Sequence, residues 1–188
     1  MAAMRLVPVL SVTALLALAG LPAVAQGQNG NDDLAALKTQ LLQLRVNPYP
    51  PPRERSAQIL GVLIRRMDVS VIDKATIDEI AGLLEDNSDT VRGRMAIALG
   101  NIGAPAKHTV PALEKAFVKA KEFTAAAQSN PQPTIGFRTY GLGTSADSIC
   151  DALAKLEAPA PTGCIHGSSG WRYESPTAPV PTGPVPAN

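Results

Sequence analysis

The stretch Arg53–Gly61, RERSAQILG, returns further along the chain as Arg92–Gly100, RGRMAIALG. Five of the nine positions are identical, including two arginines and the final Leu-Gly pair. A second echo begins at Ala98–Ala106, ALGNIGAPA, which returns as Ala152–Ala160, ALAKLEAPA. Repetition with a period of about 40 residues, as between the first two segments, is typical of arrays of paired helices. The sequence therefore predicts an all-α fold, a short α-solenoid of about three helix pairs.

The repeated segments share one apolar face when they are placed on helices. In the central repeat this face holds Val91, Met95, Ala98, Leu99 and Ile102. The equivalent residues of the first repeat are Pro52, Ser56, Ile59, Leu60 and Leu63. Those of the third repeat are Ser145, Ile149, Ala152, Leu153 and Leu156. A helix pair cannot cover such a face alone, so neighbouring pairs must stack. We expect Leu60, Leu99 and Leu153 to occupy equivalent buried sites. We also expect Gly61 and Gly100 to lie where helices approach closely.

Capping residues and prolines divide the chain into six expected helices. Five of them cover about residues 31–45, 52–66, 90–102, 110–127 and 145–156, and another helix begins near Thr76. Asn31 and Thr76 are the expected N-caps of the first and third helices, and Gly103 is expected to end the fourth. Residues 128–144 are expected to form a loop. Residues 26–160 make up the predicted solenoid domain. Residues 161–188, rich in proline and glycine, are expected to be a disulfide-linked irregular segment followed by a disordered tail.

The central segment resembles a known repeat family. The run EDNSDTVR at residues 85–92, the run AIALGNIG at 96–103 and the run VPAL at 110–113 are similar to a HEAT repeat. The likeness is to the bacterial HEAT-like variety that also occurs in phycobilisome lyases. It is close over residues 77–117 and weaker over 53–66 and 145–160. The resemblance implies helix-pair repeats and a protein-binding scaffold. It does not imply lyase activity, because many proteins without enzymatic activity share the repeat.

Residues 1–25 have the pattern of a cleavable secretory signal peptide. Arg5 is followed by an apolar run from Leu6 to Leu18, and Ala23-Val24-Ala25 supplies small residues for a cut before Gln26. A membrane anchor is the alternative, but thirteen residues of helix reach only about 20 Å, short of a ~30 Å hydrocarbon core. We therefore expect a periplasmic or secreted protein with no membrane span after cleavage.

The charge balance argues against a nucleic-acid partner. The chain has 17 basic and 16 acidic residues, and one of the basic residues, Arg5, lies in the predicted signal peptide. A general nucleic-acid binder needs a basic excess to neutralise phosphates. Aromatic residues are scarce, so the core is expected to consist of aliphatic side chains and alanine.

The two cysteines, Cys150 and Cys164, are expected to form a disulfide, which is the usual state of a cysteine pair in an exported chain. A metal site that also uses His166 and His108 is one alternative, and free thiols are another. The spacing lacks the paired pattern of structural zinc sites. No cofactor is expected.

Four arginines are candidates for binding a partner. Arg53 and Arg55 recur as Arg92 and Arg94, and on stacked helices they would form a ladder that could receive an acidic peptide. The alternative is structural: Arg92 pairs with Asp89 in its own repeat and Arg94 lies on the solvated surface. The third repeat lacks both arginines, so the ladder would stop there.

The sequence contains no recognisable catalytic motif. It lacks a Gly-x-Ser-x-Gly nucleophile turn, a phosphate loop and a dinucleotide-binding glycine motif. Asp86 and Asp89 are better explained as capping residues of a turn than as an acid–base pair. We therefore expect an interaction scaffold and not an enzyme. The first alternative is an accessory subunit of an envelope enzyme or transport complex.

Overall fold

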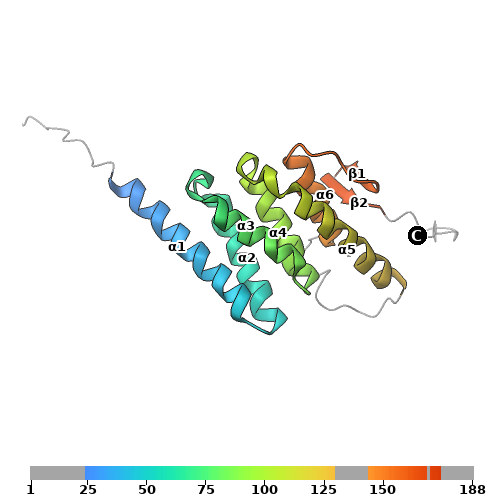
Figure 1. Cartoon of the computed structure of the whole chain (residues 1–188), viewed down its shortest axis with the longest axis horizontal. Helices are drawn as coiled ribbons and strands as arrows, with labels where there is room; N and C mark the ends of the chain where they lie inside the picture. The colour runs from blue at the N-terminus through green and yellow to red at the C-terminus, as the bar shows by residue number, and fades with distance from the viewer. Residues whose placement is uncertain (1–23, 130–143, 169, 175–188) are drawn as a thin grey trace, which may run out of the picture.

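The fold is a stack of helix pairs that follow one another across the molecule in chain order, from α1 at one end to a small β-hairpin at the other (Figure 1). The structure, a computed structural model, describes residues 24–129, 144–168 and 170–174. Residues 1–23 of the predicted signal peptide, most of the predicted 128–144 loop and the predicted tail from residue 175 lie outside the described residues. The predicted all-α class is confirmed, with the hairpin as its one departure within the described part.

The elements of the described residues are six α-helices, three 3-10 helices and two strands. The α-helices are α1 (Val24–Val46), α2 (Pro50–Arg66), α3 (Lys74–Gly82), α4 (Asp89–Ile102), α5 (Val110–Ser129) and α6 (Ser145–Lys155). The 3-10 helices are η1 (Val69–Val71), η2 (Leu83–Glu85) and η3 (Ala104–Thr109), and the strands are β1 (Cys164–Gly167) and β2 (Gly170–Tyr173). Helices α2, α4 and α6 form one row, in which α4 packs against both α2 and α6. Helix α1 packs on α2, α3 on α4, and α5 on α6.

Two predicted helix starts were wrong. Helix α1 begins at Val24, seven residues before Asn31, so Asn31 lies inside the helix and is not its N-cap. Asn31 is exposed there, where a polar side chain inside a helix costs little. The cap of α3 is Asp73, whose carboxylate accepts a 2.7 Å hydrogen bond from the backbone N–H of Thr76. Thr76 therefore donates the capping hydrogen bond through its backbone N–H and is not the N-cap residue.

The repeated leucines occupy the equivalent buried sites that their spacing predicts. Leu60 in α2, Leu99 in α4 and Leu153 in α6 are all completely buried. The predicted faces of α4 and α6 are buried along their whole length. The leucines shared by the two sequence echoes are thus buried in all three helices.

Pro52 and Ile59 depart from this pattern: Pro52 is exposed, and Ile59 is 39% exposed although its equivalent Ala98 is completely buried. On α4, Ala98 lies on the side opposite Gly93 and Gly100, which contact α6. That side of α4 therefore turns back toward the preceding helix of the row, α2. Among the described residues, α2 is the first helix of the row, and no earlier helix of the row covers the same side. The end of the row explains why Ile59 is open to solvent.

The two glycines that were expected at close approaches behave differently. A Cβ atom added to Gly100 would lie 3.0 Å from the Cα of Ala152 on α6, so a larger residue here requires α6 to shift by a few tenths of an ångström. A Cβ atom added to Gly61 would meet no atom within 4 Å, so the expectation for Gly61 was wrong. Gly93 makes a second close approach, with an added Cβ only 3.2 Å from Ser148 Oγ. The tight packing therefore belongs to the contact between α4 and α6.

The C-terminal segment begins with an unpredicted β-hairpin rather than with irregular chain. Strands β1 and β2 pair antiparallel, with Cys164 opposite Tyr173 and His166 opposite Trp171. The backbone N–H of Tyr173 donates a 2.8 Å hydrogen bond to the carboxylate of Asp147 on α6. The ring of Tyr173 lies edge-on to Phe117 of α5 at a centroid distance of 5.5 Å. The hairpin thus packs against the last helix pair.

Candidate functional site

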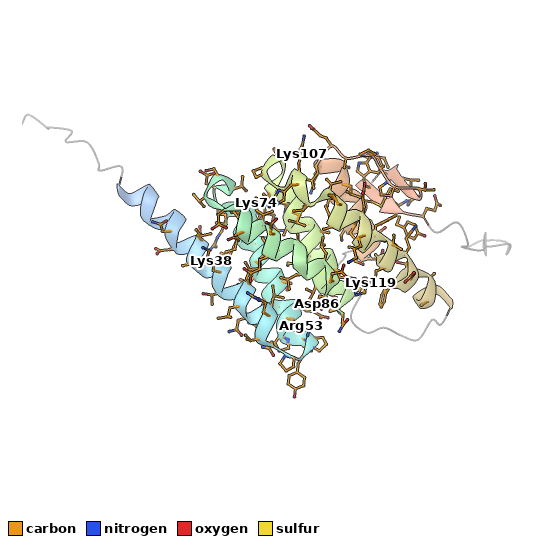
Figure 2. The ribbon with its side chains drawn as sticks, viewed as in Figure 1. Lys38, Arg53, Lys74, Asp86, Lys107 and Lys119 are labelled. Atoms are coloured by element: carbon orange, nitrogen blue, oxygen red, sulfur yellow. A yellow bond between two sulfur atoms is a disulfide. The ribbon has the colours of Figure 1, made fainter. Side chains whose placement is uncertain are left out.

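Two of the four candidate arginines, Arg53 and Arg92, face inward. Arg53 belongs to the inward pair. Its Nη1 donates to the backbone carbonyls of Asn47 at 3.4 Å and Pro48 at 3.3 Å, and its Nη2 lies 3.0 Å from the Asp86 carboxylate. Figure 2 shows Arg53 beside Asp86, where the start of α2 meets the turn before α4. Arg53 thus links the first helix pair to the second and is largely buried in doing so.

Arg92 is the second inward-facing arginine, and its side chain is only 2% exposed. Its Nη1 donates to the carbonyls of Asp86 at 2.9 Å and Asn87 at 3.2 Å, and its Nη2 lies 2.6 Å from the Asp89 carboxylate. The ring of Phe123 on α5 faces the guanidinium carbon at 5.5 Å. The expectation that Arg92 could bind a partner was therefore wrong, and its structural pairing with Asp89 is confirmed.

Asp89 extends this contact to the third helix pair. One carboxylate oxygen accepts a 3.0 Å hydrogen bond from the backbone N–H of Ser145, and the other accepts one from the Ser145 hydroxyl. Ser145 is the first residue of α6, so Asp89 satisfies a backbone donor that the helix itself leaves unpaired. Asp86 accepts hydrogen bonds from the Ser88 backbone at 2.7 Å and from Arg53. Both carboxylates hold turns and helix ends together, but the N-cap of α4 is Ser88, so the prediction that Asp86 and Asp89 cap this helix was wrong.

Arg55 and Arg94 differ in exposure, and the Nε atom of Arg94 is buried, so the expectation that Arg94 lies on the solvated surface was wrong. Arg55 is exposed on α2, and Arg94 is half-buried at the equivalent position of α4. Within the described part of the chain, Arg55 takes part in no ion pair or hydrogen bond. Of the four candidate arginines, Arg55 is thus the one that offers an unpaired charge to solvent.

Arg55 opens a stripe of exposed residues along α2, which we call the α2 seam: Arg55, Ile59, Val62 and Arg66. The spacing of four, three and four residues places all of them on one side of the helix. Ile59 is 39% exposed and Val62 is 42% exposed. The repeat pattern assigned Ile59 to the buried face, and the predicted site contained neither Val62 nor Arg66. Their spacing in the sequence is the signal that could have identified them.

A shallow depression lies between α1 and α3. It has a volume of about 360 Å³ and is lined by Lys38, Leu42, Arg45, Asp73, Ala75, Thr76 and Glu79. Its charges are paired across the two helices: Lys38 lies 3.6 Å from Asp73, and Arg45 lies 3.0 Å from Glu79. The pKa of Asp73 is lowered, mainly by the hydrogen bond from the Thr76 backbone. The depression therefore offers a ligand little uncompensated charge.

Cys150 and Cys164 form a disulfide, as predicted, so neither sulfur is available to a metal. His166 lies against Trp171 on the neighbouring strand, with ring centroids 5.5 Å apart. His108 lies 2.7 Å from Asp78, whose pKa is lowered first by Lys74 and then by His108. Among the described residues, no group of three or more His, Cys, Asp and Glu side chains is arranged to hold a metal ion.

No family model, curated protein or solved structure matches this chain. Within the described ranges, none of the helices is both long and apolar enough to cross a membrane.

Proposed function

We propose that the protein is an exported scaffold of HEAT-like helix pairs that binds another protein. The observation that carries the proposal is the α2 seam. It lies on the first helix of the row and leaves Ile59 exposed, whereas Ala98, the residue of α4 equivalent to Ile59, is buried. In stacked helix arrays, terminal repeats ordinarily present a polar outer face to water. An end face that keeps two exposed β-branched side chains is suited to contact with a further helix.

Two further features support a rigid scaffold. Arg53 and Arg92 bind equivalent carbonyls in successive turns, which supports a regular solenoid arrangement. Asp89 and Ser145 then fix the third pair on the second. The partner surface is thus built on helices that are held in register, and rigid elements lower the entropic cost of binding.

Export to the periplasm or the medium is the second part of the proposal. It rests on the signal-peptide pattern of residues 1–25 and on the disulfide between Cys150 and Cys164, which suits an oxidising compartment. N-terminal sequencing of the protein recovered from the envelope or medium should begin at Gln26. An intact Met1 on protein from the soluble cytoplasm would contradict export.

The scaffold proposal is tested by isolating the protein with its partner and rebuilding the complex. The tagged protein should run larger than its own mass in gel filtration of the envelope or medium fraction. The co-purified chain, produced separately, should re-form a complex of fixed stoichiometry with the purified protein. A protein that always elutes as a free chain and turns over a small molecule would overturn the scaffold and favour an enzyme.

A further inference from the structure

The α2 seam has a composition that selects its partner. Ile59 and Val62 form an apolar centre, and Arg55 and Arg66 flank it at the two ends. Arg65, also exposed, adds a further positive charge beside Arg66 and makes no ion pair within the described part of the chain. The seam therefore combines an apolar centre with basic ends.

The acidic residues nearest to the seam in sequence and contact do not neutralise it. Glu54 accepts a 2.7 Å hydrogen bond from the hydroxyl of Ser88 and is held toward α4. Asp33 lies 3.1 Å from Arg66, but the arginine side chain of this pair is 61% exposed. An exposed pair of this kind contributes little free energy and exchanges partners readily. The seam thus keeps a positive potential that an acidic partner would complement.

We propose that the α2 seam binds an amphipathic helix of a partner protein that carries two apolar residues flanked on both sides by carboxylates. This inference rests on the proposed scaffold function and names the chemistry of its partner. The seam spans twelve residues from Arg55 to Arg66, about 16 Å of helix. A partner helix of about three turns, with acids at positions i and i+11 and leucines at i+4 and i+7, matches it in length and spacing. Its apolar residues lie on Ile59 and Val62, and its carboxylates face Arg55 and Arg66.

A second copy of this chain is a poorer occupant of the seam. Two copies that met through the same surface would bring Arg55 and Arg66 of one copy toward the arginines of the other. Like charges facing each other across an interface are destabilising. The charge pattern therefore favours a partner of opposite sign over self-association.

The test uses the full protein purified from the cells that produce it and a synthetic peptide of the stated pattern that carries a fluorescent label. Fluorescence anisotropy measures the binding of the peptide. We expect saturable binding, weakened at least about tenfold by Arg55→Glu and by Ile59→Ser. The matched control is Arg172→Glu, which makes the same charge change on the exposed face of the hairpin. It should leave the dissociation constant unchanged. A second peptide with lysines in place of the two acids should bind poorly to the native protein and regain affinity for the Arg55→Glu/Arg66→Glu variant.

Several outcomes would overturn the inference. A scrambled peptide of the same composition that binds equally well would show nonspecific attraction. Binding to vesicles of anionic phospholipid, sensitive to Arg55→Glu, with no binding of the peptide would assign the seam to a membrane surface. Concentration-dependent dimerisation abolished by Ile59→Ser, again without peptide binding, would assign it to a second copy. If the peptide fails while the rebuilt protein complex described above persists, the partner chemistry is wrong and the scaffold stands.

Discussion

Arg53 and Arg92, at equivalent positions of successive repeats, make the same pair of backbone contacts. Each guanidinium donates from Nη1 to the two carbonyls that lie six and five residues before it, which are Asn47 and Pro48 for Arg53 and Asp86 and Asn87 for Arg92. Each arginine thereby ties the start of its helix to the turn that leads into it. Because the Nη1 atoms of Arg53 and Arg92 contact equivalent carbonyls, the repeat in the sequence is accompanied by a repeated contact in the structure.

The buried ion pair makes Arg92 a stability residue. Replacing Arg92 with Leu would leave the Asp89 carboxylate buried without its charged partner. We expect the free energy of unfolding to fall by about 3–5 kcal/mol, the usual cost of removing one member of a buried pair. Urea denaturation followed by circular dichroism measures the change. Arg55→Leu is the matched control on exposed surface, and its effect should stay within about 0.5 kcal/mol. Equal losses in the two variants would contradict the structural role of Arg92.

The repeat positions predict a second contrast, between Leu60 and its neighbour Ile59. Leu60 is completely buried, so Leu60→Ala should cost about 2–5 kcal/mol, and Leu99→Ala and Leu153→Ala should fall in the same range. Ile59 is exposed at the open end of the row, so Ile59→Ala should cost far less. Thermal unfolding of the four variants provides the comparison. A larger loss at Ile59 than at Leu60 would mean that α2 is rotated about its axis relative to the packing described.

The sequence predicted the burial of Leu60, Leu99 and Leu153 because each leucine lies in a matching segment of a repeated pattern. It did not predict the exposure of Ile59, since the echo between α2 and α4 cannot reveal that α2 is the first helix of the row in the described part of the chain. The prediction of a close approach at Gly61 was wrong for a related reason. Helix α6 comes close to α4 at Gly100, but no neighbouring atom comes close to Gly61, and the sequence echo does not distinguish the two positions.

The hairpin was beyond prediction for a different reason. Its strands have four residues each, which is too short for an alternating pattern to stand out. Their position depends on contacts with Asp147 and Phe117 that only the folded chain brings together. For the proposed binding surface, the sequence offered both Arg55, which is exposed, and Arg92, which is buried. Arg55 and Arg92 have the same side chain, and they differ in burial, which the sequence did not reveal.

The two glycines of the repeat should respond oppositely to alanine. Gly100→Ala places a methyl group 3.0 Å from the Cα of Ala152, so α4 and α6 must separate and stability should fall by about 1–3 kcal/mol. Gly61→Ala meets open space inside a helix and should stabilise the protein by about 0.5–1 kcal/mol through the lower backbone entropy of alanine. Chemical denaturation of both variants measures the two signs. Destabilisation of similar size at Gly61 would show that α2 and α4 are packed more tightly than described.

The disulfide should hold the hairpin on α6. It closes a loop with a sequence separation of 14 residues, for which the chain-entropy model gives a contribution of about 3 kcal/mol. Changing both cysteines to Ala should lower the melting temperature and increase proteolysis between Ala158 and Tyr173 before α4 is cleaved. Alkylation of the native protein should modify neither Cys150 nor Cys164. Rapid alkylation of both residues without a reductant would contradict the bond.

The cap of α3 should make stability fall in acid. The hydrogen bond from the Thr76 backbone favours the charged form of Asp73 and lowers its pKa in the folded protein. A group with a lowered folded pKa contributes stability that is fully present above its unfolded pKa, about 3.9, and is lost as the pH falls through the folded pKa. Asparagine also caps helices well but does not titrate. The stability advantage of the native protein over Asp73→Asn should therefore be largest at pH 7 and shrink as the pH falls through the folded pKa of Asp73. Melting temperatures of both proteins from pH 7 downward test this, and two curves that run parallel throughout would show that Asp73 contributes nothing to the acid sensitivity.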